Sequence, residues 1–74
     1  MHCSKRLKEL RKAKKLTQLQ VQMRVFIDQS DYSKMENGKR DPTIDQVILL
    51  AKLFETSIDY ICGVTDEKKP YPRK

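Results

Sequence analysis

The sequence predicts a small all-α domain, and three features of its 74 residues lead to that prediction. Apolar residues recur every three or four positions, a spacing that places them on one face of a helix. Serine, threonine or aspartate, which cap helix N-termini, stand directly before several of these apolar segments. No segment alternates apolar and polar residues as a strand does. Because a chain this short buries too little surface to divide its core, we expect a single domain.

The first expected helix covers residues 4–15 and is strongly basic. Leu7 and Leu10 stand three positions apart among lysines and arginines, so they share one face. Cys3 and the aliphatic stem of Lys14 would extend that face. This narrow apolar stripe is expected to pack on the core.

The second and third expected helices cover residues 18–25 and 29–36, and a tight connection at residues 26–28 separates them. Thr17 and Asp28 stand where a side-chain oxygen can cap the first amides of each helix. The side chains expected to face the core are Val21, Val25, Tyr32 and Met35.

Two further helices are expected after a stop at Asn37-Gly38, since both residues tolerate the left-handed conformation that ends helices. Residues 39–42 form a loop, and Thr43 caps a fourth helix, the most apolar segment and the expected centre of the core. Ser57 caps a short fifth helix over residues 58–62, which the following glycine ends. The apolar positions of the fourth helix are Ile44, Val47, Ile48, Ala51 and Phe54, flanked by Leu50 and Leu53.

The net charge of +6 is unevenly distributed along the chain. Residues 1–24 hold eight Lys or Arg and one Glu, a net +7, whereas residues 41–62 hold one Lys and four Asp or Glu, a net −3. A basic first third with an acidic later segment favours a molecule with one side attracted to polyanions. A basic helix that is merely solvated explains the same charges.

Composition argues against several classes of protein. No stretch approaches the roughly 20 apolar residues of a membrane span, and no secretory signal opens the chain, so we expect a cytoplasmic protein. Cys3 and Cys62 are too few for the disulfide framework of a small secreted domain. With His2 as the one histidine, the sequence predicts neither a metal site nor a catalytic group, and we expect no cofactor and no enzymatic activity.

The order of these elements resembles the DNA-binding domain of the lambda-repressor-like, Cro and Xre-type regulators, over about residues 5–63. Each matching segment is weak alone, but their order and spacing are specific. The segments are Leu16-Thr17-Gln18, residues 33–40 (Ser-Lys-Met-Glu-Asn-Gly-Lys-Arg), Pro42-Thr43-Ile44 through Leu53, and residues 57–63 (Ser-Ile-Asp-Tyr-Ile-Cys-Gly).

This resemblance implies an all-α, five-helix domain with a helix-turn-helix that binds double-stranded DNA specifically and regulates transcription, as a repressor. We expect the DNA-binding domain to cover residues 1–64 and a flexible charged tail to cover residues 65–74. A homodimer on a two-fold symmetric operator follows from the same resemblance. Its interface is expected around Ile58, Tyr60, Ile61 and Val64, with core packing the alternative for Ile58 and Ile61.

Two residues depart from the family pattern inside the motif. Gln22 stands where the family commonly has alanine, and we expect it to crowd the approach of the second and third helices. Phe26 stands where the family has glycine at the turn. We expect its ring to be a partly buried anchor near Val25, Ile27 or the fourth helix.

The third helix is the candidate reader of the major groove, where each base pair presents a distinct set of donors and acceptors. Gln29, Ser30, Ser33 and Lys34 lie on the side away from its apolar residues. Glutamine pairs well with adenine, and lysine with guanine. By resemblance Gln29 and Ser30 are base-reading positions, while Ser33 and Lys34 stand at positions that reach bases or phosphates; we expect all four to read bases. An exposed polar face without function is the alternative.

The resemblance implies phosphate contacts on both sides of this reader. They would come from Thr17 and Gln18, at the start of the second helix, and from Asn37, Lys39 and Arg40 after the third. Gln18 is also expected to brace Gln29 against its base. General electrostatic attraction is expected from Arg11, Lys14 and Lys15.

Three acidic residues need their own explanation. Asp28 is explained by capping, and Glu36 is expected to pair with a basic residue of the first helix. Asp31 either accepts from a cytosine amino group, repels phosphates, or is plain surface.

Two other functions fit parts of the sequence. An antitoxin-like module could use the same helices to bind a partner protein, and the basic first helix could lie on an anionic membrane. Salt dependence of DNA binding distinguishes the first alternative, and liposome binding the second.

Overall fold

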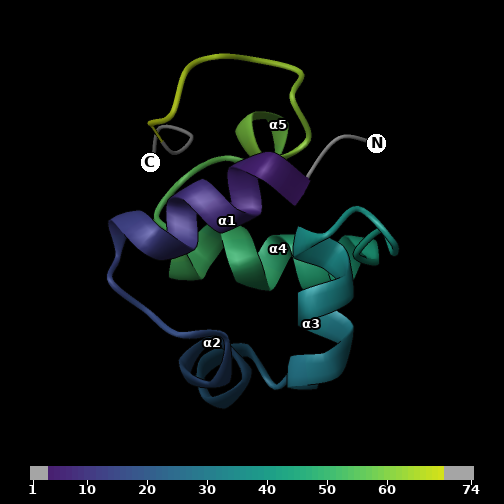
Figure 1. The fold of residues 1–74 in the computed structure, drawn as a ribbon. Helices are drawn as coiled ribbons and strands as arrows, with labels where there is room; N and C mark the ends of the chain where they lie inside the picture. The colour runs from purple at the N-terminus through teal and green to yellow at the C-terminus, as the bar shows by residue number, and fades with distance from the viewer. Residues whose placement is uncertain (1–3, 70–74) are drawn as a thin grey trace.

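The computed structural model describes residues 4–69, and within that range it contains five α-helices and no strand (Figure 1). The all-α prediction is therefore confirmed. The helices end slightly earlier than expected in two places, at Ala13 and at Ile61. Their bounds are α1 Ser4–Ala13, α2 Gln18–Val25, α3 Gln29–Glu36, α4 Ile44–Leu53 and α5 Ile58–Ile61.

The predicted N-caps are confirmed for α2, α3, α4 and α5. Thr17 accepts from the Gln20 amide while the Gln20 side chain accepts from the Thr17 amide, a reciprocal capping box. Thr43 and Gln46 repeat this arrangement at α4. Each box satisfies two amides at a helix start and fixes where the helix begins.

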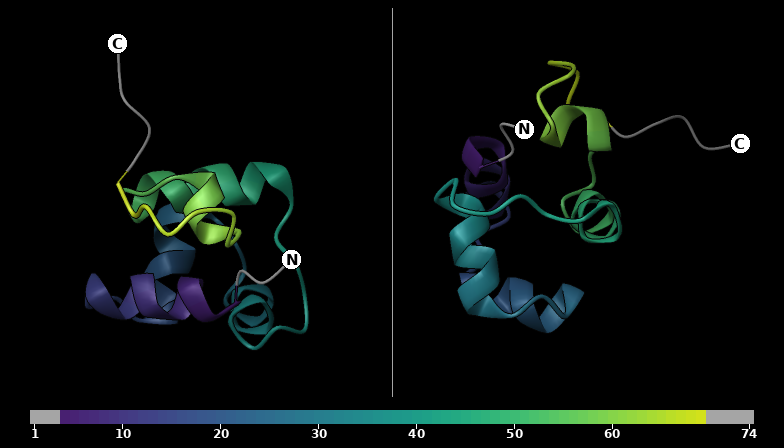
Figure 2. Two further views of the ribbon diagram at one scale, coloured as in Figure 1. Left: turned by 90° about the horizontal axis from the view of Figure 1, so that it is seen from above. Right: turned by 90° about the vertical axis from the view of Figure 1, so that its right-hand side faces the viewer.

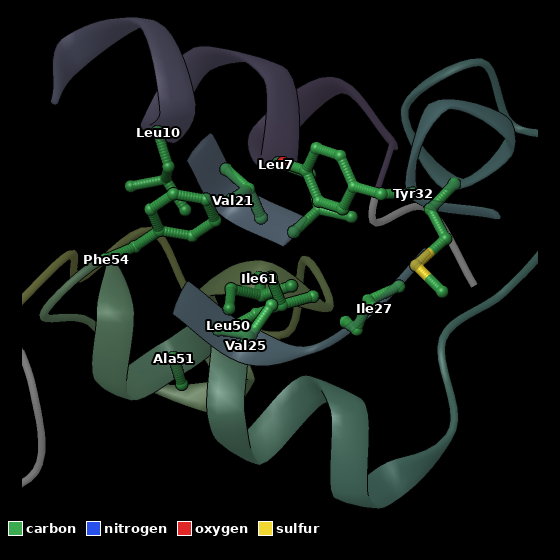
Figure 3. Packing of buried hydrophobic residues seen from close by; sticks show 11 residues of the cluster. Leu7, Leu10, Val21, Val25, Ile27, Tyr32, Leu50, Ala51, Phe54 and Ile61 are labelled. Atoms are coloured by element: carbon green, nitrogen blue, oxygen red, sulfur yellow. The ribbon is translucent and has the colours of Figure 1, made fainter. Parts of the chain in front are cut away.

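Side chains from all five helices meet in one core (Figure 3). Leu7 of α1, Tyr32 of α3, Leu50 of α4 and Ile61 of α5 are fully buried there. The expected central role of α4 holds for its later turns, but its first residue, Ile44, is exposed. Ile44 follows the cap directly, so it lies at the N-terminal end of the helix. The other core residues are Leu10, Val21, Val25, Ile27, Met35, Ala51 and Phe54.

The turn between α2 and α3 contradicts the expectation for Phe26. The ring is 90% exposed, so it is not a core anchor. Phe26 has left-handed backbone angles (φ 59°, ψ 31°), and its amide donates to the Gln22 carbonyl at 2.9 Å. Val25 and Ile27, on either side of it, are both buried. Because the chain reverses here with its two neighbours turned inward, the middle side chain points into solvent.

Residues after α5 return across the body of the molecule (Figure 2). The Arg6 guanidinium of α1 donates to the carbonyls of Tyr60 and Thr65 and pairs with Asp66 at 2.7 Å. Farther along, the Thr56 hydroxyl donates to the Lys68 carbonyl. The first part of the expected tail is thus hydrogen bonded to α1 and to the loop between α4 and α5. Cys3 and His2, and the tail's Pro70 and Pro72, lie outside the described residues.

Candidate nucleic-acid interface

The helix α3 has one inward and one outward face, and α2 packs beside it (Figure 1). Tyr32, Met35 and Glu36 are buried. All four residues predicted to read bases lie on the opposite face. Positions 29 and 33 are one helical turn apart, as are positions 30 and 34. Gln29, Ser30 and Lys34 are exposed, and Ser33 is half-buried. The fold thus presents a polar helix face to solvent.

Two side chains cap the start of α3. Asp28 accepts from the Ser30 amide at 3.0 Å, as the sequence predicted. Gln22, reaching from α2, accepts from the Gln29 amide at 2.7 Å. Gln22 was expected to crowd the two helices, but its half-buried side chain instead bonds to the first amide of α3. It fixes the backbone of the residue that begins the outward face.

The residues predicted to contact phosphate lie at two helix ends that the fold joins. Gln18, in the first turn of α2, donates to a Glu36 carboxylate oxygen at 3.2 Å, in the last turn of α3. Asn37, directly after Glu36, is exposed and approaches the Ser33 hydroxyl at 3.5 Å. The expected bond from Gln18 to Gln29 is replaced here by the one to Glu36. The exposed members of the set are Thr17, Asn37, Lys39 and Arg40.

A buried ion pair fixes the end of α3 against α1. Arg11 Nε donates to Glu36 Oε2 at 2.6 Å and Nη2 donates to Oε1 at 3.1 Å, while Nη1 donates to the Leu16 carbonyl. The Glu36 side chain is 1% exposed. Pairing of Glu36 with a basic residue of the first helix was predicted and is confirmed. Arg11 is therefore engaged inside the protein, and not free for the electrostatic attraction expected of it.

The environment of this pair favours its charged form. Burial alone would raise the pKa of Glu36, but hydrogen bonds from Arg11 and Gln18, the neighbouring Tyr32 hydroxyl and the Arg11 charge hold the pKa below its usual value. Burial, together with the Glu36 carboxylate, raises the pKa of Tyr32 far above its usual value. Among the described residues, no hydrogen bond of good geometry reaches the buried Tyr32 hydroxyl. A carboxylate is thus held ionised below the interface.

A second ion pair lies on the surface of the same helix. Arg40, in the loop after α3, contacts Asp31 Oδ1 through Nη1 at 2.9 Å. The side chains are 45% and 35% exposed, respectively. Lys14, which was expected to add attraction, pairs with Glu55 at 3.2 Å. Neither the hydrogen bond from the Gln29 amide to Gln22 nor the Asp31–Arg40 pair was predicted from the sequence, because each joins residues of different elements.

A family model described as helix-turn-helix matches residues 7–61. The chain belongs to the helix-turn-helix family. This match and the five-helix fold confirm the resemblance to lambda-repressor-like regulators. In helix-turn-helix terms, α2 and α3 are the paired helices, residues 26–28 are the turn, and α3 is the second helix of the motif. The buried network of Arg11, Gln18 and Glu36 holds this helix-turn-helix unit onto α1.

Several curated helix-turn-helix proteins are similar to the chain. It is 41% identical over 70 residues to the uncharacterized HTH-type transcriptional regulator YobD of Bacillus subtilis, covering 95% of the chain and 62% of the relative. It is 37% identical over 71 residues to the cryptic phage CTXphi transcriptional repressor RstR of Vibrio cholerae, covering 93% and 63%. The chain thus spans about three fifths of the length of these relatives. No solved structure matches it.

Residues 4–69 also bear on two other kinds of site. No helix there has the length and apolarity needed to cross a bilayer. In the same residues, no group of three or more His, Cys, Asp or Glu is placed to hold a metal ion.

Proposed function

We propose that this chain binds double-stranded DNA in a sequence-specific manner and regulates transcription as a repressor. The observation that carries the proposal is the outward face of α3, where Gln29, Ser30 and Lys34 are exposed while the opposite face is fixed in the core. A helix of this kind fits the major groove and can present side chains to base edges. Similarity to RstR, a transcriptional repressor, supports the direction of regulation.

Contacts to phosphate complete the proposed interface. Thr17 and Gln18 lie at the start of α2, and Asn37, Lys39 and Arg40 follow α3. The Gln18–Glu36 hydrogen bond draws these two groups together at one end of the reader helix. Such contacts position a protein on the duplex and carry no sequence information themselves. Base reading is therefore assigned to Gln29, Ser30, Ser33 and Lys34.

We further propose that the chain acts in the cytoplasm, as a homodimer and without catalytic activity. One short reader helix offers few base contacts, so specific affinity calls for two half-sites. Of the residues expected at the dimer interface, Ile61 is buried in the core, while Ile58 and Tyr60 are half-buried and Val64 is exposed. The proposed interface is therefore confined to Ile58, Tyr60 and Val64, and residues 65–74 are proposed to follow the DNA-binding domain as a charged tail whose first part contacts that domain.

Selection of duplexes from a random library tests the proposal directly. The full chain should enrich one sequence with two-fold symmetry, whereas no enrichment would favour a module that binds a partner protein. Binding to the enriched duplex should weaken steeply as salt is added, because phosphate contacts release counterions.

A matched pair of lysine variants locates the phosphate contacts. Lys39→Ala should make the logarithmic salt slope shallower by about one unit on every sequence. Lys52→Ala removes the same charge from an exposed position on α4 and should leave the slope unchanged. Equal slopes for the two variants would remove Lys39 from the interface.

A further inference from the structure

We propose that Asp31 competes with DNA phosphates for Arg40, and so limits the affinity of this surface for DNA of any sequence. The inference rests on the proposed DNA-binding function and assigns a regulatory role within it to a residue that reads no base. Asp31 is in the first turn of α3, and Arg40 belongs to the loop that follows the helix. The loop thus brings a proposed phosphate-binding cation back onto a carboxylate of the reader helix.

The geometry of the pair suits an exchangeable contact. Arg40 Nη1 lies 2.9 Å from Asp31 Oδ1, and both side chains are more than a third exposed. An ion pair in such surroundings is weak, because water screens the charges and the long Arg40 side chain must be held in place. The buried Arg11–Glu36 pair has two hydrogen bonds and almost no exposure, so it is not exchangeable in this way.

A DNA phosphate is a strong competing partner for Arg40. Guanidinium groups bind phosphate in a bidentate, charge-assisted manner, which favours transfer of Arg40 from the single contact with Asp31. The transfer leaves the Asp31 carboxylate near the DNA backbone, on the flank of a helix whose neighbouring residues face the groove. Asp31 therefore weakens DNA binding in two ways. Its ion pair with Arg40 is lost on binding, and its carboxylate repels phosphate.

Both effects are independent of base sequence, since they act on the phosphate contacts alone. Removing the Asp31 charge should raise affinity for the selected duplex and for random duplex by the same factor. The energy of an exposed ion pair corresponds to a gain in affinity for DNA of roughly two- to fivefold. The logarithmic salt slope should also become steeper, by up to about one unit, because one more phosphate charge is neutralised without compensation.

The test compares Asp31→Asn with Glu9→Gln in the full chain, on the selected duplex and on random duplex. Both variants raise the net charge by one, and Glu9 is an exposed residue of α1. Asp31→Asn should show the gain and the steeper slope, and Glu9→Gln should show neither. Asp31→Asn should also be added to the Arg40→Ala variant. Its gain in affinity over Arg40→Ala should be smaller than its gain over the parent, because the competition requires Arg40. Melting temperatures of all variants confirm that folded proteins are compared.

Four results would overturn the proposal. Weaker binding by Asp31→Asn would mean that Asp31 holds Arg40 in place for DNA. A change at one base pair only would make Asp31 a base-reading residue. An equal gain in affinity from Glu9→Gln would show that net charge alone explains the effect. A full gain from Asp31→Asn in the Arg40→Ala background would show that Asp31 does not compete for Arg40. In all four cases the parent chain still binds DNA, so the proposed function stands, whereas a parent that binds no DNA would overturn both.

Discussion

The inward face of α3 carries a charged residue that is fully engaged by the protein, whereas the outward face carries polar residues that are open to solvent. Glu36 receives hydrogen bonds from Arg11 and Gln18 and is buried, while Gln29, Ser30 and Lys34 are exposed. The outward side chains contribute little to folding. The position of α3 is therefore set by its inward face, and the sequence preference proposed for this chain can vary through the outward face.

The two faces also differ in what a substitution should change. Removing a group from the inward face leaves a buried partner without compensation, which lowers the free energy of unfolding. Changing an exposed residue typically alters stability by no more than about 0.5 kcal/mol. A set of variants ordered by expected effect can test this division.

The largest effect is expected for Glu36→Ala, which leaves Arg11 buried without its partner. Breaking a buried ion pair costs about 3–5 kcal/mol, so the free energy of unfolding in urea should fall by that amount. The double variant Arg11→Met/Glu36→Leu removes both charges and should recover most of the loss, since apolar groups of similar size replace buried pairs well. A loss below about 1 kcal/mol in the single variant would show that the pair is solvated.

The same ion pair predicts how stability depends on pH. Glu36 has a pKa below its usual value of 4.5 in the folded chain, so its contribution is present above that value. The contribution is lost as the pH falls through the lowered pKa of the folded state. Urea unfolding of the parent should therefore show stability decreasing on acidification below about pH 4.5, and Glu36→Gln should show a shallower decrease. Parallel pH profiles would contradict the lowered pKa.

An intermediate effect, confined to binding, is expected on the outward face. Gln29→Ala should weaken binding to the selected duplex by about 1–3 kcal/mol per half-site and relax preference at one base position. The backbone hydrogen bond to Gln22 survives this change, so stability should stay within about 0.5 kcal/mol of the parent. Random duplex is the internal control, because an equal loss there would show that Gln29 does not read bases.

The sequence predicts the local features of the fold well. Caps such as Thr17 and Asp28 depend on residues two or three positions away, so they can be recognised without knowing the tertiary structure. Apolar spacing likewise identifies the buried apolar residues of α3, Tyr32 and Met35. The pairing of Glu36 was predicted in kind, since the first helix is strongly basic, but the partner Arg11 was not singled out.

Contacts between elements could not be predicted in the same way. The Gln22 side chain bonds to an amide seven positions later, and Asp31 meets an arginine nine positions later in a loop. Both depend on where the chain turns, which apolar spacing does not specify. Phe26 shows the same limit, because its ring is large and apolar yet its direction is set by the left-handed backbone and by its buried neighbours.

The smallest effect is expected at Phe26, where the family commonly has glycine. A left-handed backbone costs a residue other than glycine about 1–2 kcal/mol, and glycine loses about 0.5–1 kcal/mol more entropy on folding. Since the ring is 90% exposed, its removal forfeits little burial. Phe26→Gly should therefore stabilise the chain by about 0.5–1 kcal/mol, which raises the melting temperature by about 2–8 °C in a domain of this size.

Phe26→Ala separates the ring from the backbone at this position. Alanine removes the ring but keeps the strained left-handed angle, so its melting temperature should stay close to that of the parent. A gain in the glycine variant alone then belongs to the backbone. If both variants melt at temperatures well below that of the parent, the Phe26 ring contributes to packing. This result would contradict a ring that points into solvent. If both melt with the parent, the turn after α2 is unstrained, and the stability of the helix-turn-helix unit rests on its inward face alone.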